Sequence, residues 1–263
     1  MKKIVLVVSL LLTGFTLLAA QDAEQIVDSS RKRIKAVTIS TKSTMNSVNS
    51  RNVTTSRELI QLSKNGSNGS RIAIEFVRPA KAAGNRLLTQ AVAGKPNDVW
   101  TSTPGSGSSN AVAKLPPART AQKLLDSDFS YDDIALPERA ASLDSHKILR
   151  EENLNGKDCY VIESTPQDSS YQYGKMIQWI DKANYVNYKI ELYDKKAVQL
   201  KTYEVLEFKE VEGRLSPWKI KMTTIKANTS TTIEAMEMRY DVDIPEGQFS
   251  QEWLATGKHG SST

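Results

Sequence analysis

Asp144, Ser145 and His146 contain the residue types of a hydrolase triad. In such a triad, the histidine accepts the serine proton and the aspartate orients the imidazole. Here the three residues are consecutive, and consecutive side chains on a strand point to opposite faces, so they cannot converge on one substrate atom. The other histidine, His259, lies in a polar C-terminal tail. Since no nucleophile, base and orienting group can be assembled, the sequence predicts a protein that is not an enzyme.

Two further segments contain residue types that bind ligands. The Gly-Ser-Gly-Ser-Ser run at 105–109 has the composition of a phosphate loop, but neither Lys-Ser nor Lys-Thr follows it, which favours a flexible loop. Asp126, Asp128, Asp132 and Asp133 offer carboxylate oxygens to calcium, yet their spacing lacks the glycine and glutamate of a known calcium loop. Turn or helix capping is therefore the favoured interpretation of these aspartates, and the sequence predicts no metal and no cofactor.

The N-terminus has the pattern of a secretory signal peptide. Two lysines follow Met1, residues 4–18 are apolar, and the small residues Ala19 and Ala20 precede Gln21. A bacterial lipoprotein would carry a cysteine directly after its cleavage site, where Gln21 stands. The sequence therefore predicts cleavage after Ala20 and a protein released into the periplasm without a lipid anchor.

Length and composition predict one domain over residues 21–254, followed by a disordered polar tail at 255–263. The single cysteine, Cys159, cannot form an internal disulfide and is predicted to be a small buried apolar residue. The formal net charge of +5 is spread along the chain. Because nucleic-acid binding uses a clustered basic stripe, nucleic acid is not expected as a partner.

The elements that must position any site are mostly strands. An amphipathic helix is predicted from Asp22 to about Lys35, and a short helix from Thr120 to Asp126. Elsewhere apolar and polar residues alternate with period two, as in 186–192, 218–222 and 236–240, with turn residues between the runs. The pattern predicts a mainly β (α+β) fold with a curved antiparallel sheet of about ten strands.

Such a sheet has more apolar surface than two helices can cover, so the sequence predicts either a closed barrel or an apolar hollow beneath a partial lid. Strand methionines, including Met176, suit a surface that accepts ligands of variable shape. The predicted lining residues of the hollow are Ile74, Phe76, Leu88, Trp100, Val186, Tyr188, Ile190, Leu192, Trp218, Ile220, Met222, Met236 and Met238.

An ordered series of motifs begins at Phe76-Val77-Arg78-Pro79 and continues with Gly84, Asp98-Val99-Trp100 and Pro104. It then includes Asp128, Phe129, Tyr131 and Asp132 within the run Ser-Asp-Phe-Ser-Tyr-Asp-Asp at 127–133, and it ends at 244–249. This series resembles the outer membrane lipoprotein-sorting proteins, which are relatives of the LolA and LolB lipoprotein carriers.

The resemblance implies a half-open barrel whose helices cover a hydrophobic cavity that shelters lipoprotein acyl chains. It also implies a donor protein in the inner membrane and an acceptor in the outer membrane. Two alternatives remain open at this point. One is a carrier of lipid or glycolipid on the same fold, and the other is a protein-interaction or adhesin-like module with a solid interior.

Overall fold

A computed structural model describes residues 22–66, 69–92, 95–105 and 109–258. The predicted signal peptide and most of the predicted tail lie outside these residues, as does the middle of the 105–109 run. The described residues form one antiparallel sheet of 13 strands in the order β6-β5-β4-β3-β2-β1-β13-β12-β11-β10-β9-β8-β7. The strands are β1 (Thr38–Val48), β2 (Thr54–Gly66), β3 (Gly69–Arg78), β4 (Arg86–Val92), β5 (Lys95–Thr103), β6 (Ala111–Lys114), β7 (Asp144–Leu154), β8 (Lys157–Pro166), β9 (Lys175–Asp181), β10 (Asn187–Tyr193), β11 (Gln199–Val211), β12 (Arg214–Thr224) and β13 (Thr229–Tyr240).

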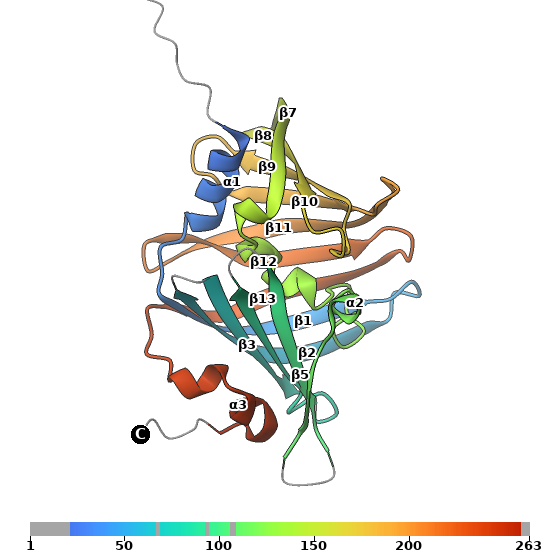
Figure 1. Cartoon of the computed structure of the whole chain (residues 1–263), viewed down its shortest axis with the longest axis vertical. Helices are drawn as coiled ribbons and strands as arrows, with labels where there is room; N and C mark the ends of the chain where they lie inside the picture. The colour runs from blue at the N-terminus through green and yellow to red at the C-terminus, as the bar shows by residue number, and fades with distance from the viewer. Residues whose placement is uncertain (1–21, 67–68, 93–94, 106–108, 259–263) are drawn as a thin grey trace, which may run out of the picture.

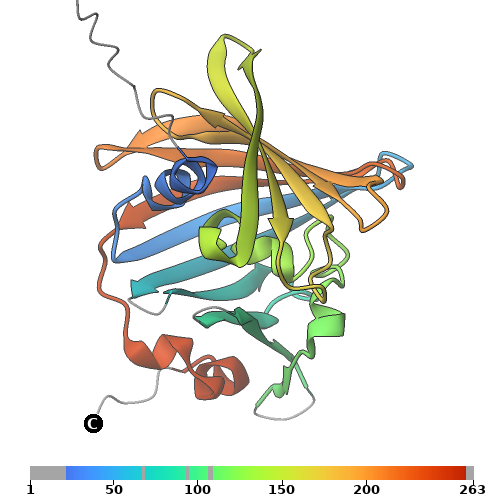
Figure 2. The ribbon, with the colours of Figure 1, turned by 45° about the horizontal axis from the view of Figure 1, so that its top comes forward.

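The strand order explains how the chain crosses the sheet. Strands β1 to β6 run from the centre to one edge, and β7 to β13 run from the other edge back to the centre, where β13 pairs with β1. The connection from β6 to β7 must therefore span the whole sheet. We call this connection, residues 115–143, the central segment. Figure 2 shows the curved sheet bending around this segment. The two edge strands, β6 and β7, do not pair with each other, so the sheet is not closed.

The mainly β, curved antiparallel prediction is confirmed, but the predicted number of about ten strands is too low. The edge strand β6 has only four residues, and β7 is exposed along most of its length. An edge strand that buries neither face leaves no apolar alternation in the sequence, which is the signal used to count strands.

The N-terminal helix forms as predicted but is shorter, from Ala23 to Lys32 (α1). Asp22 caps it by accepting a hydrogen bond from the Glu24 amide at 3.3 Å, and two basic residues end it, as the helix dipole favours. Its buried Ile26 and Val27 pack against Ile162 and Ile180. Figure 1 shows the helix beside strands β8 and β9.

The predicted helix at Thr120–Asp126 is wrong in position. Helix α2 occupies Pro117–Thr120, with proline at its start, where the missing amide hydrogen costs nothing. Leu125 and Asp126 have φ angles of 45° and 60°, a left-handed conformation that no helix continues through. The rest of the central segment contains two short 3-10 helices, η1 (Asp132–Glu138) and η2 (Ala141–Leu143).

The C-terminus contains two elements that the sequence analysis does not predict. A 3-10 helix, η3 (Glu246–Phe249), precedes helix α3 (Gln251–Thr256), and Figure 1 shows both beside β3 and β5. Trp253 and Leu254 are buried there. The helix includes Ala255 and Thr256, so the first residues of the predicted disordered tail are helical, because Ser250 caps the helix start and Gly257 ends it in a left-handed conformation.

Candidate functional site

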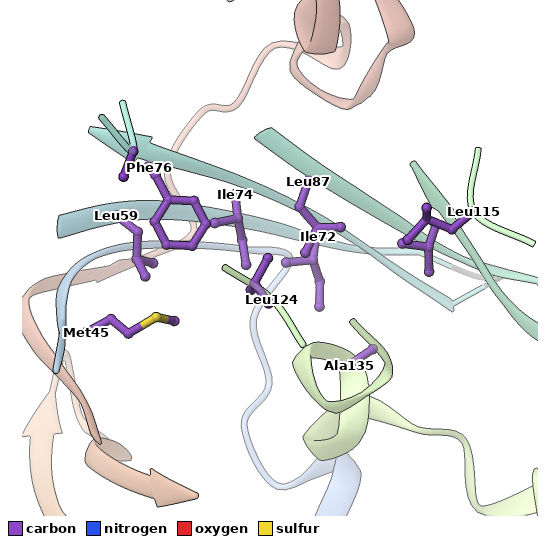
Figure 3. Close-up of a cluster of buried hydrophobic side chains, with 11 residues drawn as sticks. Met45, Leu59, Ile72, Ile74, Phe76, Leu87, Leu115, Leu124 and Ala135 are labelled. Carbon is purple, nitrogen blue, oxygen red and sulfur yellow. The ribbon is translucent and has the colours of Figure 1, made fainter. Parts of the chain in front are cut away.

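The face of the sheet that the central segment covers, here called the inner face, is a continuous apolar surface. Figure 3 shows one half of it, where the strands β1 to β5 face the segment. Ile134 and Ile233 contact both halves and join them. The buried cluster at the first half joins Leu115, Leu124 and Ala135 of the segment with Met45, Leu59, Ile72, Ile74, Phe76, Ala82, Leu87 and Val99. The buried cluster at the second half joins Phe129 and Leu136 of the segment with Tyr171, Tyr173, Met176, Ile190, Leu192, Tyr203 and Met222.

Several predicted lining residues lie together on this face. Ile74 and Phe76 belong to its first half, and Ile190, Leu192 and Met222 belong to its second half. Each of them is 1% exposed or less. Side chains of the central segment, such as Leu124 and Leu136, cover them. The structure therefore shows these five residues packed beneath the segment.

Other predicted lining residues lie elsewhere. Leu88 and Trp100 are on the outer face, in a cluster with Trp253 of α3, because each is the neighbour of an inner-face residue on its strand. Tyr188 joins a cluster with Cys159 and Trp179 on the outer face of the other half. These residues cannot line the same hollow as Ile74, and that part of the prediction is corrected.

The remaining predicted residues are spread along the sheet. Met236 is 43% exposed, because it sits where the register between β1 and β13 shifts by one residue. Ile220 packs at the border of the inner face. Trp218 is half-buried, and the Lys209 ammonium lies 4.1 Å from its ring centroid. Met238 accepts a hydrogen bond from the Tyr240 hydroxyl. Val186 is buried in the turn before β10.

Asp128 attaches the central segment to the middle of the sheet. It is 2% exposed, and its carboxylate accepts hydrogen bonds from Thr224, Thr229 and Thr231 at 2.6, 2.5 and 2.8 Å. The Asp128 amide in turn donates to the Thr231 hydroxyl at 2.9 Å. A buried carboxylate with three hydroxyl donors is well satisfied, so this contact holds the segment without a counter-charge.

Asp133 makes a second attachment. Its carboxylate accepts from the Tyr173 hydroxyl and forms an ion pair with Lys201 of β11, both at 2.7 Å. It also accepts from the Ser130 amide at 2.8 Å. Phe129 lies between the two aspartates in the sequence and is buried in the inner face, while Tyr131 packs at its border. The Ser-Asp-Phe-Ser-Tyr-Asp-Asp run is therefore the part of the segment that attaches it to the sheet.

Asp132 is the acidic residue of this run with a clearly shifted pKa. Burial raises the pKa of Asp132 to about 6, the nearby Asp133 carboxylate acts in the same direction, and a hydrogen bond from Thr120 opposes them. With Arg139 and Tyr171, Asp132 borders a small pocket of about 30 Å³, the space of a water molecule. Arg139 also forms a two-point ion pair with Asp144, with distances of 2.7 and 3.1 Å.

The other motif residues support the first half of the sheet. Arg78 is exposed and pairs with Glu58 at 3.6 Å, and the Arg78–Pro79 peptide bond is cis. Gly84 has a φ of +79° and approaches Pro104 so closely that a Cβ atom there would lie 3.3 Å from the proline ring. The amide of Gly84 donates to the Phe76 carbonyl and closes the turn between β3 and β4.

The candidate catalytic residues are held in structural contacts. The imidazole of His146 lies 2.7 Å from the Ser164 hydroxyl and 2.9 Å from the Ala141 carbonyl oxygen, so both of its nitrogens are engaged. Asp144 pairs with Arg139 and not with His146. Cys159 is fully buried, as predicted, and burial raises the pKa of its thiol to about 11.

Among the described residues, no cluster of three or more His, Cys, Asp and Glu side chains is placed to hold a metal ion. None of the helices in this part of the chain has the length and apolar character needed to cross a membrane.

The fold is similar to that of three solved structures. A DUF1329 family protein from Desulfovibrio piger and a putative outer membrane lipoprotein-sorting protein domain from Vibrio parahaemolyticus both superimpose with a TM-score of 0.82. They are 21% and 22% identical, and each alignment covers 88% of this chain and 97% of the other. A LolA superfamily protein from Nitrosomonas europaea superimposes with a TM-score of 0.71 at 22% identity, over 89% of this chain and 100% of that one.

A family model described as an uncharacterized protein family matches residues 68–256, and the chain belongs to that family. The match includes the central segment, both of its aspartate attachments and helix α3. A comparison with curated protein sequences finds no match.

Proposed function

We propose that this protein is a periplasmic, non-enzymatic carrier that binds the acyl chains of lipoproteins against its inner face and helps sort them to the outer membrane. The observation that supports the proposal best is the way in which the central segment covers the inner face. The apolar inner face of a wide sheet is closed by an irregular segment, and the segment is held at a few polar points.

An acyl chain can replace the side chains of the central segment on the inner face at a small net change in free energy. Burying one methylene group stabilises a complex by about 0.8 kcal/mol, so a long acyl chain could contribute on the order of 10 kcal/mol. Binding displaces Leu124, Phe129 and Leu136 from the same surface, which offsets much of that gain. A carrier needs this near balance because it must also release its cargo.

The polar attachments of the segment suit a cover that opens. Asp128 and Asp133 bind hydroxyl and ammonium groups, which can hydrogen-bond to water once the segment leaves. The strands below pair with one another through their own backbones, as β1 does with β13 and β11 with β12. The segment could therefore leave the inner face while the sheet stays intact.

The periplasmic location and the partners rest on the sequence. The signal-peptide pattern of residues 1–20 supports export, and the fold likeness to a lipoprotein-sorting domain supports a donor in the inner membrane and an acceptor in the outer membrane.

Native mass spectrometry of the mature chain, followed by lipid extraction, tests the proposal. We expect acylated protein or lipid to copurify, and a fluorescent fatty-acyl probe to be displaced by added lipoprotein. An Ile190→Trp variant should bind the probe more weakly, because a larger side chain fills the inner face, whereas Ile148→Trp on exposed β7 should not. A chain that is empty and does not bind the probe would contradict the proposal.

A further inference from the structure

A groove of about 310 Å³ lies where the inner face ends, between the β1–β2 turn and the central segment. Its walls come from parts of the chain that are far apart in sequence. The residues that line it are Ser47, Val48, Asn49, Val53, Thr55, Arg57, Lys81, Lys123, Asp126, Asp128 and Thr229.

Three cations of the groove lack counter-charges among the described residues. Arg57, Lys81 and Lys123 form no ion pair with any residue that the structure describes, although 16 ion pairs join other residues there. Lys81 and Lys123 are exposed, whereas Arg57 is half-buried. Its Nη1 atom is buried and has no hydrogen-bond partner among the described residues. A buried guanidinium nitrogen without a partner is costly, and because Arg57 lines the groove, a turn of its side chain would bring the guanidinium to an anion there.

The two carboxylates of the groove differ in their effect on an anion. Asp128 already accepts three threonine hydroxyl groups, which compensate much of its charge. Asp126 is exposed, and no partner for its side chain lies within the described residues. The formal charge of the lining is therefore +1, with three cationic groups against two carboxylates.

The groove is continuous with the apolar inner face. Arg57 is directly opposite Met45 in the β1–β2 register, and Met45 is fully buried in the inner face. Two residues further along the strands, toward the β1–β2 turn, Ser47 is paired with Thr55. Lys123 directly precedes the buried Leu124 in the sequence. Along β1 and β2 the same face thus changes from apolar to hydroxyl-bearing and cationic over two residues.

An amphiphilic ligand likewise has an apolar part next to a polar, charged part. We propose that the groove binds the phosphate of a phospholipid headgroup whose acyl chains lie on the inner face, so that the protein carries anionic membrane phospholipid as well as, or in place of, a lipoprotein. The guanidinium of Arg57 offers paired donors to two phosphate oxygens, and Lys81 supplies further positive charge. Arg57 belongs to β2 and Lys81 to the β3–β4 turn, so both stay in place when the central segment, with Lys123, leaves the inner face. This inference rests on the proposed function, because it requires the inner face to accept acyl chains.

The test titrates the delipidated mature chain with three probes of known structure. They are dioctanoyl phosphatidylglycerol, dioctanoylglycerol, which has the same chains without phosphate, and inorganic phosphate. We expect the phosphatidylglycerol to bind at least ten-fold more tightly than the dioctanoylglycerol. Inorganic phosphate alone should bind weakly, since it lacks the acyl chains.

Two variants locate the effect. Lys81→Gln changes an exposed side chain and should fold normally, while Arg57→Gln removes the half-buried cation. Each should weaken the binding of phosphatidylglycerol several-fold and leave that of dioctanoylglycerol unchanged. Lys157→Gln, at the exposed start of β8 near the far edge of the sheet, is the charge-matched control and should change neither.

The outcomes separate the two proposals. If dioctanoylglycerol binds but the phosphate adds no affinity, or if the variants weaken both lipids equally, the groove inference is overturned and the carrier proposal stands. If neither lipid binds, both fail. Inorganic phosphate binding as tightly as the lipid would identify a site for free phosphate and overturn the inference.

Discussion

Asp128 makes the most concentrated contact between the central segment and the sheet, and its removal leaves three threonine hydroxyls without their shared acceptor. We expect Asp128→Ala to lower the free energy of unfolding by about 3 kcal/mol, since hydrogen bonds to a charged group contribute more than neutral ones. Urea unfolding measures the change. Asp126→Asn, two residues earlier at an exposed site, is the matched control and should change stability by less than about 0.5 kcal/mol. Equal effects would show that Asp128 does not hold the segment.

Asp132 gives the segment a pH dependence. Because burial raises its folded-state pKa to about 6, the folded protein binds the proton more tightly than the unfolded chain does. The contribution of Asp132 to stability therefore falls as the pH rises from about 4 through 6 and stays low above that. We expect Asp132→Asn to remove this slope and to raise the melting temperature at pH 7.5 relative to wild type more than at pH 4. A difference that is constant across this range would contradict the assignment.

At the scale of elements, helix α3 covers the outer face and the central segment covers the inner face, so they should have separable roles. Trp253→Ala empties a fully packed site beside Leu88 and should cost about 3 kcal/mol of stability. It should leave the affinity for a fatty-acyl probe unchanged at a temperature where the variant is folded. Thermal unfolding and probe titration on the same sample check both statements. A loss of probe affinity would place the acyl site on the outer face.

The sequence predicts the elements that have a strong local signal. The cap and charges of α1 are visible in 22–32, and the alternation in 186–192 and 218–222 predicts the strands β10 and β12. A register shift between Asn187 and Lys189 nevertheless turns Tyr188 to the outer face, away from Ile190. It does not predict that Leu88 and Trp100 face away from Ile74, since strand alternation gives two faces but does not say which face an unrecognised helix will cover. Helix α3 escapes notice because six residues are too few to show a helical period.

The candidate site is predictable only where its residues give a local signal in the sequence. The run Ser-Asp-Phe-Ser-Tyr-Asp-Asp stands out by composition, and its aspartates were expected to cap turns. Their actual partners, Thr224, Thr231 and Lys201, are between 68 and 103 residues away in the chain. Such partners depend on the strand order, which local patterns do not contain. The bulge that exposes Met236 is likewise set by the pairing of β1 with β13.

At the scale of the whole molecule, the strand order makes the central segment a consequence of topology. A sheet built from its centre to one edge, and then from the other edge back to its centre, needs a connection across one face. In this protein the connection covers the apolar surface that a carrier would offer to its cargo. We expect that the segment must leave the inner face before an acyl chain can bind there.

The most direct test is a reversible lock on the segment. The Asp128 amide nitrogen lies 2.9 Å from the Thr231 hydroxyl, so Asp128→Cys and Thr231→Cys in a Cys159→Ser background place two thiols close together. Mass spectrometry confirms the crosslink, made by oxidation or by a short bis-thiol reagent, and the uncrosslinked background protein under the same treatment is the control. Because the crosslink holds the segment on the inner face, we expect the crosslinked protein to bind a fatty-acyl probe at least ten-fold more weakly than the reduced protein. Equal affinity and equal binding rates in the two states would contradict it.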